Sequence, residues 1–311
     1  MRLSILIVNW NSGPLLRRCL DSIGDALVAW TRADYEVLVV DNGSTDGSLS
    51  TAPSSTPHRV LQLGRNCGFG AACNRAAELA EGEYLLLLNP DGELRAGCAE
   101  RCIAELQRRD IAVGVCGLAL VDEHGSIARS CARFPGFASL LCSASGLNAL
   151  WPRLAGWQMT DWDHASDCTV DHVIGAFYLM PAALFRRLGG FDERFFLYLE
   201  DLDLSLRVRQ AGLMTRFLAE PRAFHLGGGV SRQVLARRLF YSTRSRVLYA
   251  FKHLPRWQGL VHLAVTLIVE PVARSLHALL RRSLPDFKAT WRAFRWMYRE
   301  LPVLLGRNAL P

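Results

Sequence analysis

The sequence Gly189-Gly-Phe-Asp-Glu-Arg-Phe-Phe-Leu-Tyr-Leu-Glu-Asp-Leu-Asp-Leu-Ser-Leu-Arg207 places acidic residues among large apolar ones. It contains five carboxylates: Asp192, Glu193, Glu200, Asp201 and Asp203. Carboxylates are rarely buried among apolar side chains unless they are paired or have a chemical role. The glycine pair predicts a turn, and the leucine spacing after it predicts a helix. We therefore expect Glu200 and Asp201 where a loop enters a helix, because free backbone N–H groups there favour an anion.

Several apolar runs precede this stretch, and each is followed by polar residues. Three of them are Leu3–Val8, Tyr35–Val40 and Glu83–Leu88, which lead into Asn9, Asp41 and Asn89-Pro-Asp91. Continuous apolar runs predict buried parallel strands when the segments between them have the apolar spacing of helices. The sequence therefore predicts an α/β fold with a mostly parallel central sheet flanked by helices. Ligands bind at the C-terminal edge of such sheets, where these polar residues would lie.

Two of these strand ends have competing interpretations. Asp41 is well placed for a nucleobase or ribose, but Ser44 to Gly47 also suit the capping turn of a helix. Asp91 follows a stiff proline, where it could bind a metal or a diphosphate. The run Asn-Pro-Asp-Gly equally has favourable turn chemistry. The residues alone leave both alternatives open.

A glycine-bearing turn and a histidine are further candidates. Gly64–Gly70 precedes a predicted helix, so its backbone could approach a phosphate, or it could be only a tight turn. The spacing is not the dinucleotide fingerprint and no Walker lysine follows, which disfavours NAD binding and ATP hydrolysis. His225 is followed by three glycines, which leave room for a ligand at the ring, although a lone histidine is more often structural.

Charge is distributed unevenly along the chain, whose net charge is +7. Residues 231–311 hold 15 Arg and Lys against 3 Asp and Glu, a net charge of +12, so the remainder carries −5. Apolar stripes between these arginines favour interfacial membrane helices over nucleic-acid binding. A packed helical subdomain or a dimer interface is the alternative. No uninterrupted apolar run approaches the ~20 residues needed to span a bilayer.

These features predict the organisation and location of the chain. We expect a domain over residues 1–252 and a basic amphipathic helical tail over 253–311 that contacts a membrane surface. The nine cysteines are scattered without a CxxC pair, which predicts reduced thiols rather than disulfides or a zinc site. The apolar N-terminus lacks a cleavage site, so it is expected to be a strand. The expected location is cytoplasmic, peripheral on the inner face of the cell membrane.

The ordered motifs resemble those of the family 2 glycosyltransferases, of the GT-A fold, over about residues 2–252. The matching motifs are Ile5-Leu-Ile-Val-Asn-Trp-Asn11, Val39-Val-Asp-Asn-Gly-Ser-Thr-Asp46, Asn66-Cys-Gly-Phe-Gly-Ala-Ala-Cys-Asn74, Leu87-Leu-Asn-Pro-Asp91, Gly175-Ala-Phe, Gly190-Phe-Asp-Glu-x-Phe-Phe, Glu200-Asp-x-Asp-Leu and His225. Within the family the chain looks most like the rhamnosyltransferase branch. The resemblance implies inverting transfer of a sugar, with L-rhamnose from dTDP-rhamnose as the best guess. The acceptor would be a hydroxyl of a lipid-linked glycan or a polysaccharide.

The resemblance also implies roles for individual residues. The positions that match the nucleotide-sugar site are Val8, Trp10, Asp41, Asn66, Asn74 and Asn89. Asp201 matches the general base, with Glu200 and Gly175 on the acceptor side. Asp91 and His225 match ligands of a divalent cation, Mg²⁺ or Mn²⁺. Asn89 replaces the first Asp of the common metal motif, so we expect the metal to bind weakly or only with the donor.

The other carboxylates of the opening stretch, Asp192, Glu193 and Asp203, are expected to be structural, capping the turn or pairing with arginines. Two other functions compete with transfer. One is a non-catalytic nucleotide-sugar-binding assembly subunit. The other is a nucleotidyltransferase, which the non-basic loop Asn9–Gly13 disfavours.

Overall fold

The computed structural model describes residues 2–50, 56–147, 156–159, 161–227 and 234–306 of the 311-residue chain. By spatial proximity the chain divides into two units. The first, which we call the sheet unit, comprises Met1–Arg133, Trp162–Glu193 and Asp201–Val230. The second, the helical unit, comprises Phe134–Asp161, Arg194–Glu200 and Ser231–Pro311. The domain boundary expected between residues 252 and 253 stays a prediction.

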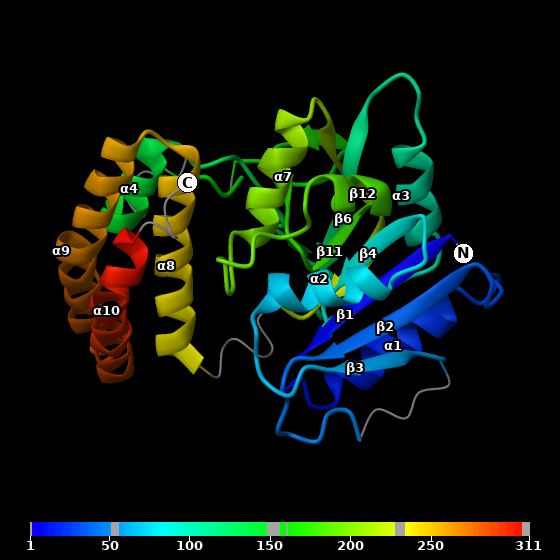
Figure 1. The fold of residues 1–311 in the computed structure, drawn as a ribbon, viewed down its shortest axis with the longest axis horizontal. Helices are drawn as coiled ribbons and strands as arrows, with labels where there is room; N and C mark the ends of the chain where they lie inside the picture. Colours follow the sequence, from blue (N-terminus) through cyan, green and yellow to red (C-terminus); the bar gives the residue numbers. More distant parts are fainter. Residues whose placement is uncertain (1, 51–55, 148–155, 160, 228–233, 307–311) are drawn as a thin grey trace. The chain divides into compact units, whose positions relative to one another are not determined.

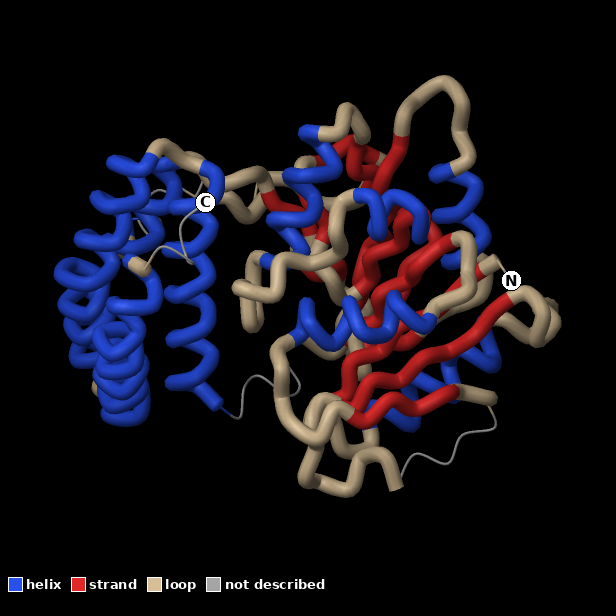
Figure 2. Tube along the Cα trace, in the orientation of Figure 1, coloured by secondary structure: helices blue, strands red, loops and turns tan. Residues whose placement is uncertain are grey.

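The sheet unit is built on a mixed, mostly parallel sheet with the strand order β3-β2-β1-β4-β11-β6-β12-β5 (Figure 1, Figure 2). Its strands are β1 (Leu3–Asn9), β2 (Tyr35–Asp41), β3 (Arg59–Gln62), β4 (Tyr84–Leu88), β5 (Gly92–Glu93), β6 (Val113–Val121), β7 (Ile127–Ala128), β9 (Cys168–Val170), β11 (Phe177–Pro181) and β12 (Met214–His225). Strands β8 (Cys131–Ala132) and β10 (His172–Val173) form a separate pair. Strand β11 runs antiparallel between β4 and β6, and β5 runs antiparallel to β12. The predicted fold class is therefore confirmed.

Helices follow the strands as the periodicity predicted. The sheet unit contains α1 (Leu15–Ala26), α2 (Phe69–Leu79), α3 (Cys98–Leu106), α6 (Ala182–Arg187) and all but the first residue of α7 (Glu200–Gln210). Alternation along a strand sends successive side chains to opposite faces of the sheet. One face of β1 and the inner face of α1 meet in the main core through fully buried residues: Leu3, Ile5, Ile7, Leu16, Leu20 and Ile23. Burial of each such side chain stabilises the fold by about 1.5–3 kcal/mol.

The start of α7 is attached to the glycine turn by one arginine. Asp203 is fully buried and forms a 2.9 Å ion pair with Arg207, one turn later on the helix. Arg207 also donates hydrogen bonds to the carbonyls of Leu188 and Gly190, at 2.7 and 2.8 Å. The expected structural role of Asp203 is thus confirmed. Because a buried charge must be paired, this contact holds the opening stretch in one arrangement.

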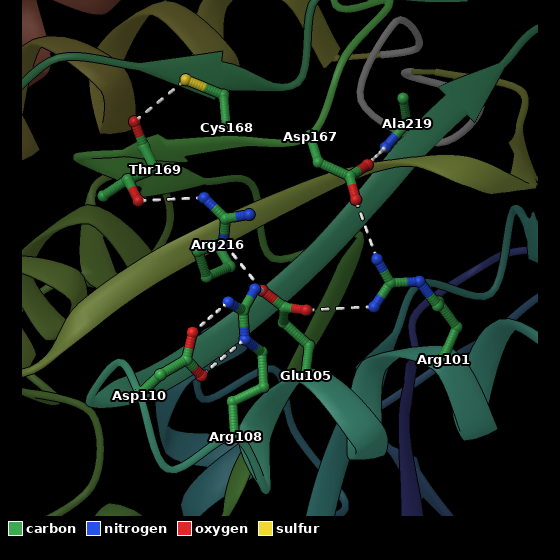
Figure 3. Close-up of polar contacts among 9 residues, drawn as sticks. All are labelled: Arg101, Glu105, Arg108, Asp110, Asp167, Cys168, Thr169, Arg216 and Ala219. Carbon is green, nitrogen blue, oxygen red and sulfur yellow. Dashed lines mark hydrogen bonds and ion pairs between the residues drawn. The ribbon is translucent and has the colours of Figure 1, made fainter.

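A second buried carboxylate, Glu105, joins α3 to β12 (Figure 3). It accepts hydrogen bonds from Arg101, Arg108 and Arg216, at 3.0, 3.1 and 2.9 Å. Burial opposes ionisation, but the hydrogen bonds from Arg101 and Arg216 outweigh it and lower the pKa of Glu105. Asp167 extends the network, since it pairs with Arg101 and accepts from the backbone N–H of Ala219.

The helical unit consists of α4 (Phe137–Ser145), α8 (Leu235–His253), α9 (Arg256–Leu280) and α10 (Leu284–Leu305). Its interior contains an ion pair of 2.6 Å between Arg246 of α8 and Glu270 of α9. Among the described residues, α9 is long and apolar enough to cross a membrane by length and composition alone. Counting uninterrupted apolar runs missed this, because His262, Thr266 and Glu270 interrupt the helix with buried polar side chains.

We predict that Glu105→Ala lowers the free energy of unfolding by about 3 kcal/mol, because it leaves three arginines without their shared buried partner. Urea unfolding followed by circular dichroism measures the change. The control is Glu78→Ala, which removes an exposed pair with Arg75 and should leave the free energy of unfolding nearly unchanged. Equal effects of the two substitutions would contradict the prediction.

Candidate active site

The C-terminal ends of β1 and β2 are tied together by side chains. Asn9 and Asp41 are register partners in these parallel strands, and both are buried. The Asn9 amide donates to Asp41 Oδ1 and to Ser48 Oγ, both at 2.9 Å. Asp41 Oδ2 also accepts from the backbone N–H of Ser44 at 3.2 Å. Asp41 therefore organises the turn that follows β2. In the described residues 42–50 this turn does not begin a helix, so the expected helix cap does not form there, and a contact with a nucleotide stays a prediction.

The glycine turn before α2 is shaped by two asparagines. Asn42, which is buried, donates to Asn66 Oδ1 and to the carbonyl of Gly68, both at 3.1 Å. Asn66 in turn accepts from the N–H of Gly68 at 3.0 Å. Gly68 has φ of 94°, and within the described chain no side chain caps the helix that follows it. The first N–H groups of α2 thus suit an anion such as a phosphate.

Asn74 connects α2 with the acidic stretch. Its amide nitrogen donates to the carbonyl of Phe191 at 2.9 Å and to the Glu193 carboxylate at 3.0 Å. Its oxygen accepts from the N–H of Phe191 at 2.8 Å. A Cβ atom at Gly190 would approach this oxygen to 2.5 Å, which explains the glycine. Asn74 holds the turn in place, and its expected contact with the nucleotide stays a prediction.

Asp91 and His225 are brought together by the pairing of β5 with β12. In that pair His225 lies opposite Gly92, and the N–H of Leu226 donates to the carbonyl of Asp91. His225 Nε2 lies 3.2 Å from Asp91 Oδ1 and 3.4 Å from the amide nitrogen of Asn89. The turn expected from Asn-Pro-Asp-Gly also forms, because the N–H of Gly92 donates to the carbonyl of Asn89.

The donor atoms of this pair suit a divalent cation. A carboxylate oxygen and an imidazole nitrogen are ligands that Mn²⁺ accepts. The described residues contain no group of three or more His, Cys, Asp and Glu side chains that could enclose a metal. The protein would therefore supply two ligands, Asp91 and His225, and a substrate or water the others.

Asp201 is held at the first turn of α7. Its Oδ2 accepts from the N–H of Gly175 at 2.7 Å, and its Oδ1 from the N–H of Leu202 at 2.8 Å. Behind it, His172 Nε2 lies 3.7 Å from Oδ2, and His172 Nδ1 lies 3.0 Å from Ser205 Oγ. Burial lowers the pKa of His172, although Asp201 acts in the opposite direction. The sequence interpretation missed His172, and its only signal was a position three residues before the glycine of a motif.

Two consecutive residues connect Asp201 with the Asp91 side of the site. The N–H of Gly175 donates to Asp201, and the carbonyl of the next residue, Ala176, accepts from the N–H of Asn89 at 3.1 Å. A Cβ atom at Gly175 would meet Asp201 Oδ2 at 3.3 Å and Phe69 at 3.5 Å. The structure therefore places Asp201, Asn89, Asp91 and His225 along one edge of the sheet.

The remaining predicted residues lie near strand and helix ends. Val8 is buried in β1, and Trp10 follows that strand half-buried. Glu200 is buried and begins α7. The two residues before it, Tyr198 and Leu199, have φ of 69° and 65°, which is uncommon for bulky residues. The backbone therefore turns sharply immediately before Asp201, as strained segments near functional sites often do.

Comparison with known proteins agrees with this geometry. The family model "Glycosyl transferase family 2" matches residues 4–141. The N-acetylglucosaminyl-diphospho-decaprenol L-rhamnosyltransferase of Mycobacterium tuberculosis is 30% identical over 247 residues, which cover 72% of this chain and 75% of that protein. Rhamnosyltransferase WbbL of Escherichia coli is 25% identical over 171 residues, covering 55% and 62%.

Solved structures show the same fold. The mannosyltransferase PcManGT of Pyrobaculum calidifontis, in complex with GDP-Man and Mn²⁺, has a TM-score of 0.54 at 17% identity and covers 99% of this chain and 81% of that chain. Residues 1–349 of S. aureus TarS, in complex with UDP-GlcNAc, have a TM-score of 0.53 at 14% identity, covering 96% and 92%.

The fold, the motifs and the relatives all identify the family of the chain. The sheet has the GT-A strand arrangement, and the motifs expected for a sugar transferase lie along its edge. The family model matches residues 4–141, and the relative at 30% identity covers 72% of the chain. The chain is a glycosyltransferase that belongs to glycosyl transferase family 2, in its rhamnosyltransferase branch.

Proposed function

We propose that this glycosyltransferase moves L-rhamnose, with inversion, from dTDP-rhamnose to a hydroxyl of a lipid-linked glycan. The observation that carries the proposal is the placement of Asp201 on the sheet edge that also holds Asp91 and His225, through the adjacent residues Gly175 and Ala176. The choice of sugar and acceptor is supported by the M. tuberculosis relative, whose name specifies a rhamnosyltransferase for a diphosphate-linked glycan.

Asp201 is the base in this proposal. Its two backbone hydrogen bonds fix the carboxylate and leave lone pairs for an incoming hydroxyl. The acceptor oxygen attacks the anomeric carbon and forms the new C–O bond, while its proton passes to Asp201. The bond from that carbon to the donor diphosphate breaks, and its electron pair leaves with the diphosphate. Attack from the side opposite the leaving group inverts the anomeric centre.

The donor diphosphate would lie between the start of α2 and the Asp91–His225 pair. The free N–H groups that follow Gly68 stabilise negative charge there. A divalent cation, Mg²⁺ or Mn²⁺, bound by Asp91 and His225 would neutralise charge on the departing diphosphate. The nucleoside would contact the ends of β1 and β2, at Val8, Trp10 and Asp41.

The helical unit supports a location at the cytoplasmic membrane surface. A row of apolar side chains on α9 is exposed: Val261, Ile268, Val272, Leu276 and Leu279. Large exposed apolar faces on a basic helical segment are typical of interfacial helices. A membrane-bound enzyme can meet an acceptor that cannot leave the bilayer.

We predict that Asp201→Asn lowers kcat by about 10²–10⁴-fold, because the base is lost while the shape of the side chain is kept. Affinity for dTDP-rhamnose should change less than about twofold. Transfer assays and isothermal titration calorimetry measure the two quantities. Asp110→Asn, the same substitution at an exposed carboxylate outside the site, is the matched control and should keep near-wild-type turnover. Wild-type turnover of Asp201→Asn would exclude its role as the base.

We predict that Asp91→Ala and His225→Ala each weaken Mn²⁺-dependent donor binding by about tenfold or more, because each removes one of two protein ligands. Calorimetric titrations of donor with Mn²⁺ and with EDTA measure this dependence. His124→Ala, which alters a mostly exposed histidine in a hairpin turn, is the control. Donor affinity that responds to Mn²⁺ equally in all variants would remove the pair from the metal site.

We predict that Gly175→Ala lowers kcat by about tenfold or more with little change in KM for the donor, because the new methyl group displaces Asp201. Steady-state kinetics measure both constants. The control is Gly136→Ala, where a Cβ atom would meet open space. A larger effect on donor KM than on kcat would contradict this prediction.

A further inference from the structure

A groove of about 810 Å³ lies in the helical unit between the beginnings of α8 and α10. Its lining includes three cationic and three aromatic side chains: Arg237, Lys288, Arg292, Phe287, Trp291 and Trp296. We propose that this groove binds the diphosphate head and the first hydrocarbon units of a polyprenyl-type lipid. The inference rests on the proposed lipid-linked acceptor and names the part of the chain that would hold its lipid.

The charge of the groove is uncompensated. Within the described residues, none of Arg237, Lys288 and Arg292 forms an ion pair. Two other arginines of α8, the helix that carries Arg237, do form ion pairs. Arg244 pairs with Glu300, and Arg246 pairs with Glu270. Three unpaired cations around one groove repel one another unless an anion is bound.

The geometry of α10 concentrates this charge. Lys288 and Arg292 are four residues apart, so they project from the same face of the helix. Arg237 lines the groove from the first turn of α8. Cations from two helices can thus reach one head group, as charge-assisted hydrogen bonds to a phosphate require.

The aromatic lining supplies an apolar surface. Trp291 is 45% exposed, a large fraction for a tryptophan on a helix. Trp296 packs edge-on against Phe240 of α8, with ring centroids 5.8 Å apart. That contact fixes one wall of the groove before any ligand binds. Tryptophan and phenylalanine beside cations suit an amphiphile, because hydrocarbon packs on the rings while the head group meets the charges.

Charge and volume select among anionic ligands. A diphosphate carries two or more negative charges, whereas a phosphatidylglycerol head carries one, so three cations match the diphosphate better. The groove is also far larger than an inorganic phosphate needs, and it lies in the range of sites for small organic ligands. These two observations favour a lipid diphosphate as the occupant.

The test uses the full-length protein and farnesyl diphosphate as the probe, with affinity measured by isothermal titration calorimetry in dilute detergent. The Arg237→Gln/Lys288→Gln/Arg292→Gln variant should bind at least tenfold more weakly than the wild type. The control variant, Arg256→Gln/Arg281→Gln/Arg299→Gln, removes the same charge from the helical unit outside the groove. It should keep wild-type affinity. Equal losses in both variants would overturn the proposal, because they would indicate general electrostatic attraction.

Two further ligands identify the chemistry that the groove recognises. Farnesol and inorganic pyrophosphate should each bind at least tenfold more weakly than farnesyl diphosphate, because each lacks one half of the amphiphile. Competition by phosphatidylglycerol in bicelles at equal concentration would overturn the assignment to a diphosphate. The binding assay needs no sugar donor. A wild-type enzyme that binds farnesyl diphosphate but does not turn over any nucleotide sugar would therefore refute the proposed function while leaving the groove assignment standing.

Discussion

Two neighbouring residues, Gly175 and Ala176, set the spacing of the site. The N–H of Gly175 holds Asp201, and the carbonyl of Ala176 holds the backbone of Asn89. Both depend on β11, which continues directly from these residues and pairs antiparallel with β4, so that Phe177 lies opposite Leu88. Because backbone polar groups inside a protein must be satisfied, the register of this strand pair leaves little freedom to either half of the site. A glycine at position 175 leaves room for the carboxylate, because a Cβ atom there would crowd Asp201 Oδ2 at 3.3 Å.

Local patterns predicted the parts of the site but not how they meet. The apolar runs that form β1, β2 and β4 were evident, and so were the polar residues after them, because buried parallel strands are continuous hydrophobic segments. The pairing of His225 with the strand after Asp91 joins residues more than 130 positions apart. No periodicity in the sequence encodes such a contact, and only the resemblance to a family suggested it.

The structure also shows the contacts of residues whose type alone does not distinguish a structural role from a role in ligand binding. Asn74 and Asn66 were expected at the nucleotide, yet their amides hydrogen-bond to the backbone and side chains of neighbouring loops. Asparagine has both donors and an acceptor on a short side chain, so it serves loop geometry and ligand binding equally well. Histidine is similarly ambiguous, and His172 was overlooked because nothing beside it in the sequence points to Asp201.

The asparagine bridge from α2 has a consequence for the order of events during turnover. The Asn74 amide hydrogen-bonds to the backbone of Phe191 and to the carboxylate of Glu193. These residues lie ten and eight positions before Asp201 in the sequence. The same helix begins at the glycine turn where a donor phosphate would bind. Under the proposed function, a movement of α2 on binding the donor would be transmitted to the segment that precedes Asp201. The proposed mechanism would then be ordered, with the donor binding before the acceptor.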